Sequence, residues 1–235
     1  MALHGRGVRP LPRLLAATAL SALAAASQAQ VSGSLGVDSD DRYRGVSLSR
    51  SRPSVHASLN YDAPQRWYAG ASATRAALTP AQTATQLSGY AGWSTAPVDG
   101  RSVELGLDGS HFAGVTGYDF AEAYAGVLSE RWSARLYYAP DYYGRRTQTS
   151  YVELNAFPPL DRRVRLFAHA GALVPLAGAS ADAARTRFDV SAGAGVALGG
   201  WDLHAAVFAA TRGGPYPAVY DGRRAALVIG AAVSF

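Results

Sequence analysis

Two residues near the start of the chain have the types and the spacing that nucleophilic catalysis requires. His56 and Ser58 lie two positions apart, so on a strand both side chains point the same way and the imidazole can activate the hydroxyl. A lipid hydrolase must present such a pair to lipid, whereas this pair shares a face with Ser54 and Asn60, which we expect to point inward. The sequence identifies no residue that would orient the imidazole. We therefore predict no catalytic residue and no enzyme, and an outer-membrane lipid hydrolase using His56 and Ser58 stays as an alternative.

Other patterns that hold metals or cofactors are weak in this sequence. The chain has no Cys and no clustered His, so it offers no transition-metal site. Asp38, Asp40 and Asp41 are interpreted as a charged loop end rather than a cation site. The glycines at 195, 199 and 200 flank an apolar strand with no helix after it, which excludes a phosphate-binding loop. We predict no metal and no cofactor.

A larger set of charged and imidazole side chains alternates with aliphatic residues along short segments. Residues that alternate in this way share one face of a strand, so we expect the set to line the interior of a sheet that closes on itself. Its members are the candidate pore-lining residues His56, Glu104, Asp108, Glu122, Arg135, Glu153, Arg165, His169, Asp189, Asp202 and His204. Their opposed charges predict a polar pore that selects solutes and that is narrow or constricted by a loop. The alternative is a lumen filled by ion pairs and Tyr side chains.

A second group of candidates lies in the expected outer loops. Arg and Tyr side chains there have the chemistry to bind an anionic sugar or a lipid headgroup through ion pairing and aromatic stacking. The outer-loop binding candidates are Arg44, Tyr142, Tyr143, Arg145 and Arg146. The alternative for the loop at 140–146 is a solvated loop with an interfacial belt of Tyr side chains.

The first 29 residues have the pattern of an export signal. Arg6, Arg9 and Arg13 form a basic start, residues 14–26 form a short apolar run, and Ser27 and Ala29 are small residues at the expected cleavage site. Residues 1–29 are therefore predicted to be a signal peptide that is removed, and residues 30–235 to be one barrel domain.

Removal of the leader changes the charge balance of the chain. Three of the 22 basic residues lie in the leader, which leaves 19 against 17 acidic residues, a net charge of +2. This balance does not favour nucleic acid as a partner. Beyond the leader no apolar run is long enough for a membrane helix, so a mature chain that spans a membrane must do so in strands.

Period-two alternation of apolar and polar residues predicts twelve strands. Each segment is weak evidence alone, but the series continues to the last residue, Phe235. The expected strands cover about 31–39, 54–61, 67–73, 87–93, 103–108, 121–127, 132–138, 151–156, 164–170, 188–194, 201–207 and 225–235. The fold class predicted is all-β, a transmembrane antiparallel up-and-down β-barrel of about 12 strands after a cleaved signal peptide.

The connections and the tryptophans favour the same architecture. Every second connection is short and the others are longer, as in a barrel with tight periplasmic turns and long outer loops. Trp67, Trp93, Trp132 and Trp201 all lie on the apolar face next to a short turn. Indole rings are enriched at a membrane boundary, so we expect these four to form one aromatic girdle.

Several motifs resemble those of a known family. The segment Ser39-Asp40-Asp41-Arg42-Tyr43-Arg44-Gly45-Val46-Ser47 is similar to the SDYRYRG(I/V)S signature of TorF-family porins of proteobacteria. Later blocks match in order at 67–70, 122–126, 137–144 and 151–155. Asp41 stands where that family has an aromatic residue, and the block around Glu104 and Asp108 lacks the family's Tyr. The resemblance implies an outer-membrane barrel, and a channel is the function it favours.

The function predicted is an outer-membrane porin-like channel for passive diffusion of small hydrophilic solutes. An alternative is a non-conducting barrel that acts through its outer loops. The expected location is the bacterial outer membrane. The expected partners are outer-membrane lipid and lipopolysaccharide, small hydrophilic solutes, and the barrel assembly machinery through the last strand ending in Phe235.

Overall fold

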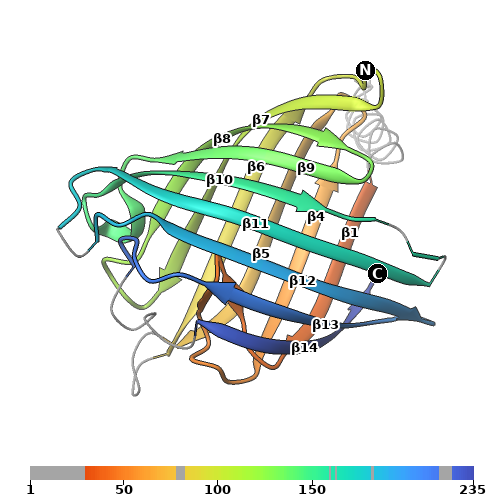
Figure 1. The fold of residues 1–235 in the computed structure, drawn as a ribbon. Helices are drawn as coiled ribbons and strands as arrows, with labels where there is room; N and C mark the ends of the chain where they lie inside the picture. The colour runs from red at the N-terminus through yellow and green to blue at the C-terminus, as the bar shows by residue number, and fades with distance from the viewer. Residues whose placement is uncertain (1–29, 78–82, 159, 162, 181–182, 217–223) are drawn as a thin grey trace, which may run out of the picture.

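The computed structural model shows a closed ring of antiparallel strands. It describes residues 30–77, 83–158, 160–161, 163–180, 183–216 and 224–235. Within these ranges twelve strands form one barrel, each paired with its neighbours in the chain, and the last strand closes on the first (Figure 1). The fold predicted from the alternation is thereby confirmed. The predicted signal peptide and its cleavage site lie outside the described residues.

The barrel strands and the smaller elements have the following bounds. The barrel consists of β1 (Gln30–Asp38), β4 (Ser54–Asp62), β5 (Trp67–Ala77), β6 (Thr83–Ser94), β7 (Arg101–Ala113), β8 (Phe120–Ser129), β9 (Trp132–Ala139), β10 (Gln148–Ala156), β11 (Val164–Ala177), β12 (Arg187–Leu198), β13 (Trp201–Ala210) and β14 (Ala225–Ser234). A two-stranded hairpin of β2 (Arg42–Tyr43) and β3 (Val46–Ser47) lies between β1 and β4, and a 3-10 turn, η1 (Tyr142–Gly144), lies between β9 and β10. Among the described residues no helix is long and apolar enough to cross a membrane.

Side chains alternate between the two faces of the ring as the sequence predicts. On β7, Leu105 and Leu107 point outward and are 57% and 64% exposed. Glu104, the residue before Leu105, points inward and is 1% exposed. The same outward apolar set continues around the ring. An apolar exterior around a polar interior is the arrangement that hydrocarbon solvates, because hydrocarbon offers no hydrogen bonds to polar groups.

Some strands run further than the alternation predicts. The segment predicted at 103–108 becomes β7 over Arg101–Ala113, and the segment predicted at 164–170 becomes β11 over Val164–Ala177. Most of the extra residues lie at the end of the barrel opposite the short turns. There the inner face also carries apolar side chains, Phe112 on β7 and Leu173 on β11, both 0% exposed, so the alternation of apolar and polar residues fades before the strand ends.

The two ends of the barrel differ in their connections. Short turns join β4 to β5, β6 to β7, β8 to β9, β10 to β11 and β12 to β13 at the end of the barrel where β1 begins and β14 ends (Figure 1). At the opposite end the connections range from the five residues between β5 and β6 to the 15 between β1 and β4. The predicted alternation of short and long connections therefore holds only in part, because the β5–β6 connection is shorter than the seven-residue turn between β10 and β11. Trp67, Trp132 and Trp201 open their strands at the short-turn end, and Trp93 is paired with Trp67 there. All four Trp residues therefore lie at one end of the barrel, as predicted, and their role as a girdle at a membrane boundary stays a prediction.

Glycines on the inner face make room for Tyr rings. Gly106 pairs directly with Tyr124, and Gly92 pairs with Tyr68, in each case on the neighbouring strand. The Tyr ring lies across the glycine so closely that a Cβ atom there would overlap the phenol group. These pairs let large polar rings lie flat against the inner wall, which leaves the middle of the ring for the loops described next.

Candidate functional site

The first long loop folds into the barrel instead of standing above it. Residues 44–49 are all buried, and the loop forms a small hairpin of β2 and β3. We call residues 40–50 the lumen hairpin. At its tip Arg44 and Gly45 both have positive φ, 47° and 74°, as in a tight type I′ turn. A left-handed conformation is uncommon for Arg, and it persists only where the surroundings fix it.

Arg44 fixes the tip of the lumen hairpin to the barrel wall. Its Nη1 donates to Glu122 Oε1 at 2.9 Å, and its Nη2 donates to Glu122 Oε2 at 2.6 Å. Its Nη1 also donates to the hydroxyl of Tyr142 at 3.2 Å. The guanidinium is surrounded by four aromatic rings, with centroids 4.0 to 5.6 Å away: Tyr151, Tyr43, Tyr137 and Tyr142. This buried, bidentate ion pair inside a ring of phenols is the strongest attachment that we identify for the loop.

Asp40 organises the other end of the lumen hairpin. Its carboxylate accepts hydrogen bonds from the Nε of Arg42 at 2.7 Å and from the hydroxyl of Ser49 at 3.0 Å. The hydroxyl of Ser47 and the backbone N–H of Ser51 also donate to it. One carboxylate therefore holds four donors of the same loop, which explains why a segment rich in Ser and Asp is ordered.

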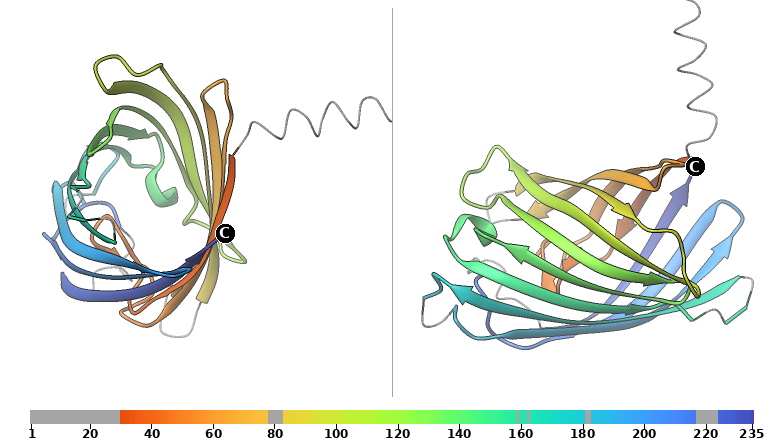
Figure 2. Two further views of the ribbon diagram at one scale, coloured as in Figure 1. Left: turned by 90° about the vertical axis from the view of Figure 1, so that its right-hand side faces the viewer. Right: turned by 90° about the horizontal axis from the view of Figure 1, so that it is seen from above.

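A second loop reaches inward and packs on the lumen hairpin. Tyr142 and Tyr143 of η1 are both fully buried. Their rings lie 4.9 and 4.7 Å from the ring of Phe120, and both also contact Tyr216. These aromatic rings and the lumen hairpin together fill the part of the lumen nearest the long loops. Figure 2 shows the ring nearly end-on, with chain inside it.

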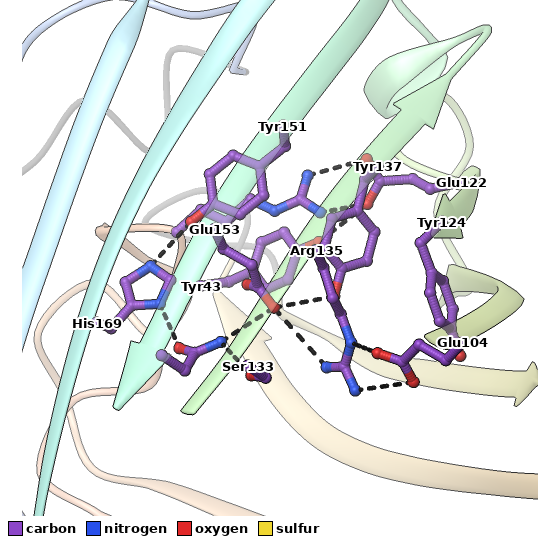
Figure 3. Close-up of polar contacts among 12 residues, drawn as sticks. Tyr43, Glu104, Glu122, Tyr124, Ser133, Arg135, Tyr137, Tyr151, Glu153 and His169 are labelled. Atoms are coloured by element: carbon purple, nitrogen blue, oxygen red, sulfur yellow. Dashed lines mark hydrogen bonds and ion pairs between the residues drawn. The ribbon is translucent and has the colours of Figure 1, made fainter. Parts of the chain in front are cut away.

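A second polar cluster lies on the inner wall next to the lumen hairpin (Figure 3). Arg135 Nε donates to Glu104 Oε1 at 2.5 Å, and Arg135 Nη1 lies 3.7 Å from Glu153 Oε1. The hydroxyl of Tyr68 donates to Glu104, and that of Tyr137 donates to Glu153 at 3.1 Å. Both carboxylates therefore share one guanidinium, with phenol donors completing the network.

Two further clusters contain the inward imidazoles. His169 Nε2 lies 2.9 Å from Asp189 Oδ1, and its Nδ1 lies 2.7 Å from Asn155 Oδ1. Tyr151 donates to the same Asp189 carboxylate at 3.2 Å. Elsewhere on the wall, Asp38 lies between two imidazoles, 3.3 Å from His56 Nδ1 and 2.9 Å from His204 Nε2. In the part of the chain that the structure describes, no group of three or more His, Cys, Asp or Glu side chains is arranged to hold a metal ion.

All the candidate pore-lining residues lie on the inner face of the barrel. Eight of them join the clusters around Glu122, Arg135, His169 and Asp38 described above. Of the remaining three, Arg165 is paired with Asp202 through both terminal guanidinium nitrogens, and Asp108 faces a cavity in the lumen. Their placement agrees with the sequence; their role in passing solutes stays a prediction.

The outer-loop binding candidates divide into two groups. Arg145 and Arg146 are exposed, as expected. The placement predicted for Arg44, Tyr142 and Tyr143 is wrong, because all three are buried inside the barrel and are not available at an outer surface. Arg44 is held inside the barrel by the carboxylate of Glu122 and by the Tyr rings around its guanidinium. Glu122 lies 78 residues away in the chain, so the local sequence pattern does not reveal it.

The candidate catalytic pair has other partners. The hydroxyl of Ser58 lies 2.8 Å from that of Ser34, and His56 contacts Asp38. Asp38 is a partner for the imidazole that the sequence did not identify. Both side chains nevertheless face the lumen from β4, so the pair is not presented to lipid as the hydrolase alternative requires.

The inner wall also encloses a cavity of about 610 Å³ beside the lumen hairpin. Strands β5 to β9 form most of its wall, and Tyr43 of the lumen hairpin and Phe120 of β8 contribute rings. Three carboxylates and one guanidinium line it: Asp62, Glu104, Asp108 and Arg135. A volume of this size is in the range of small-molecule sites.

Charge near the base of the lumen hairpin depends on pH. Asp41 lies outside the spanning strands, and burial, reinforced by the nearby carboxylates of Asp38 and Asp40, raises its pKa from 3.8 to about 6. The hydroxyl of Thr74 donates to it at 3.5 Å and opposes the shift. Because the pKa is raised in the folded state, protonated Asp41 stabilises the docked loop, and this contribution is lost as pH rises through about 6.

We expect the Asp41→Asn variant to remove this dependence. Its melting temperature should stay above that of the unmodified protein at pH 7.5, and the two should approach one another near pH 5, where Asp41 carries a proton. The measurement is thermal unfolding in detergent followed by circular dichroism between pH 4.5 and 8. Two curves that remain parallel over this range would contradict the assignment.

A closed barrel with an apolar exterior and a polar, loop-filled lumen defines the class as a porin-like β-barrel. Within that class, the chain belongs to the family described as "Bacterial protein of unknown function (Gcw_chp)", whose model matches residues 22–226. The matching model is not that of the TorF family, so that finer assignment stays a prediction.

Solved structures with a similar fold carry porin names. The NanC porin has a TM-score of 0.57 at 9% sequence identity, and the KdgM porin has a TM-score of 0.56 at 10% identity. Each alignment covers 87% of this chain and 99% of the other. A further structure, the KdgM porin in complex with disordered oligogalacturonate, has a TM-score of 0.55 at 8% identity and covers 88% of this chain and 99% of that one. At such identities the likeness shows the fold. No curated protein sequence matches this chain.

Proposed function

We propose that this chain is an outer-membrane channel of the porin type that lets small hydrophilic solutes diffuse passively. The observation that carries the proposal is the lumen: its wall is polar, and it holds a cavity of about 610 Å³ inside a barrel whose exterior is apolar. A polar interior inside an apolar wall is the arrangement that lets solutes avoid hydrocarbon. The longest connections, those between β1 and β4 and between β13 and β14, lie at one end of the barrel and support an orientation with that end outside the cell.

Similar proteins support the same proposal. The KdgM and NanC structures are named as porins, and the KdgM complex contains an oligogalacturonate. The motifs of this chain also resemble those of TorF-family porins. The lumen hairpin and the aromatic rings of η1 occupy part of the cross-section, so we expect a channel of small conductance rather than a wide pore.

The test is single-channel recording of the purified, refolded protein in planar bilayers. We expect stepwise current increases of uniform small size in potassium chloride. Folded protein that inserts into the bilayer and gives no steps would contradict the proposal and favour the non-conducting barrel, whose exposed Arg145 and Arg146 lie in an outer loop. Resistance of the barrel to unfolding in unheated sodium dodecyl sulfate shows whether the protein tested is folded.

The Ser58→Ala variant separates the channel from the hydrolase alternative. Because the Ser58 hydroxyl bonds to Ser34 on the inner wall, its removal should leave the conductance near that of the unmodified protein. A lipase activity of the purified protein that disappears in this variant would instead support the hydrolase.

A further inference from the structure

The cavity beside the lumen hairpin has a composition that indicates which solutes it accepts. Its wall combines carboxylates, hydroxyl groups and the rings of Tyr68, Tyr90, Tyr124 and Tyr137. The openings between these rings are polar: Ser88 and Ser110 lie within 2.9 Å of one another on adjacent strands and face the same space. Apolar faces with a few convergent polar groups are typical of small-molecule sites.

The charge of this wall is unbalanced. Three of its side chains are carboxylates and one is a guanidinium, Arg135. Arg135 is already shared between Glu104 and Glu153, and the guanidinium of Arg44, which also lies in the lumen, is held by both oxygens of Glu122. These two guanidinium groups are therefore paired with acids other than Asp62 and Asp108.

The side chain of Asp108 also indicates that the cavity binds a ligand. Its Oδ1 atom is buried and has no hydrogen-bond partner among the residues that the structure describes. A buried carboxylate oxygen without a partner is unfavourable, and a cation or an N–H donor in the cavity would supply the missing contact.

The rings provide a further attraction for positive charge. In the same lumen, the guanidinium of Arg135 lies over the ring of Tyr124 at 5.6 Å, and that of Arg44 lies over Tyr151 at 4.0 Å. The lumen thus already holds the guanidinium groups of two Arg side chains against the faces of Tyr rings. The rings of Tyr68 and Tyr90, whose centroids are 6.1 Å apart, border the cavity and offer the same kind of surface to a solute.

We propose that this cavity binds small organic cations, such as alkylammonium or amino-alcohol compounds, between the Asp62 and Asp108 carboxylates and the Tyr rings. The proposal rests on the channel function proposed above, since the cavity then makes the channel conduct cations in preference to anions. The proposal concerns the sign of the charge on the solute, which the similarity in fold to other porins does not determine.

Binding is tested with choline and its uncharged isostere 3,3-dimethylbutan-1-ol, using titration calorimetry on the full-length barrel in detergent micelles. The two probes have nearly the same shape and differ in the charged nitrogen. We expect choline to bind and the isostere to bind at least about tenfold more weakly, since a unit charge about 6 Å away in a medium of effective dielectric about 40 changes an affinity by roughly that factor. Equal binding of the two probes, or no binding of choline, would overturn the proposal.

Variants assign the effect to the two carboxylates. Asp62→Asn and Asp108→Asn should each weaken choline binding by roughly tenfold. The matched control is Asp99→Asn, which removes the same charge from an exposed short turn and keeps a residue that tolerates the positive φ of 51° there. Because Asp62 ends β4 at the edge of the barrel, its variant is expected to fold even if the Asp108 variant does not. Unchanged binding in Asp62→Asn and in any folded Asp108→Asn protein would contradict the site.

Recording in a potassium chloride gradient separates this inference from the channel function. A reversal potential that indicates cation preference, reduced in the Asp62 and Asp108 variants and unchanged in the Asp99 variant, is the expected result. Anion preference would overturn the inference while leaving the channel intact. Choline binding without any current would support the site and contradict the channel.

Discussion

The Arg44→Ala variant is expected to release the lumen hairpin, lower the stability of the docked loop by about 3–5 kcal/mol, and increase single-channel conductance. The size of the effect follows from the position of Arg44, whose side chain is 5% exposed, and of Glu122, whose side chain is fully buried. Removal of the guanidinium leaves a buried carboxylate without its cation and four Tyr rings without the group they surround. Undocking relieves both penalties, and the space that the loop occupied becomes available to ions.

Conductance histograms and thermal unfolding of the purified variant measure this effect. The control is Arg52→Ala, which removes an exposed Arg from the same loop and should change neither quantity. Glu122→Gln tests the other partner. If the ion pair is the attachment, the double variant should cost less than the sum of the two single variants. Conductance and melting temperature equal to those of the unmodified protein in Arg44→Ala would contradict the role of this pair.

The Leu107→Arg variant is expected to lower the unfolding free energy of the barrel in lipid vesicles by about 2–4 kcal/mol. Leu107 lies near the middle of β7, faces outward and is 64% exposed in the isolated chain. If hydrocarbon covers this face, a guanidinium there must be buried in lipid or must deform the bilayer to reach water. The penalty is largest near the midplane and falls toward the boundaries.

Unfolding by urea in vesicles gives the free energy for this comparison. The matched control is Val98→Arg, the same type of change at a side chain that is 70% exposed in a short turn, where the cost should be at most about 1 kcal/mol. Leu107→Met controls for the loss of the Leu shape. Equal penalties for the two Arg variants would mean that water, not hydrocarbon, contacts the outer face of β7.

The strands could be predicted from the sequence because one local rule acts at every position. A slip of one residue on β7 would turn Glu104 to the outside and Leu105 to the lumen, so the alternation of these side chains fixes both the strand and its faces. The turns added independent information. Local alternation did not predict how far the strands continue beyond the alternating segments, as far as Ala113 on β7 and Ala177 on β11, because apolar Phe112 and Leu173 lie on the inner face there.

The candidate site was predicted less completely, for a physical reason. That Glu122, Arg135 and Asp189 face inward follows from strand parity alone. The direction in which a loop folds does not, because it depends on partners such as Glu122 for Arg44, which lie 78 residues apart in the chain. The one local signal was the composition of residues 39–47, where Arg44 stands between Tyr43 and Gly45 at a turn that requires positive φ. Such a residue is a candidate for a special tertiary contact.

The join between β1 and β14 is the shortest strand pairing in the described barrel. It aligns five residue pairs, from Ser34 with Ser234 to Asp38 with Gly230, whereas β1 aligns nine with β4. Two backbone bonds between Gly33 and Phe235 extend it to the last residue. Until this pairing forms, β1 and β14 each have a free edge that can pair with another strand. With the fewest paired residues to hold it closed, this join is where we expect the ring to open first.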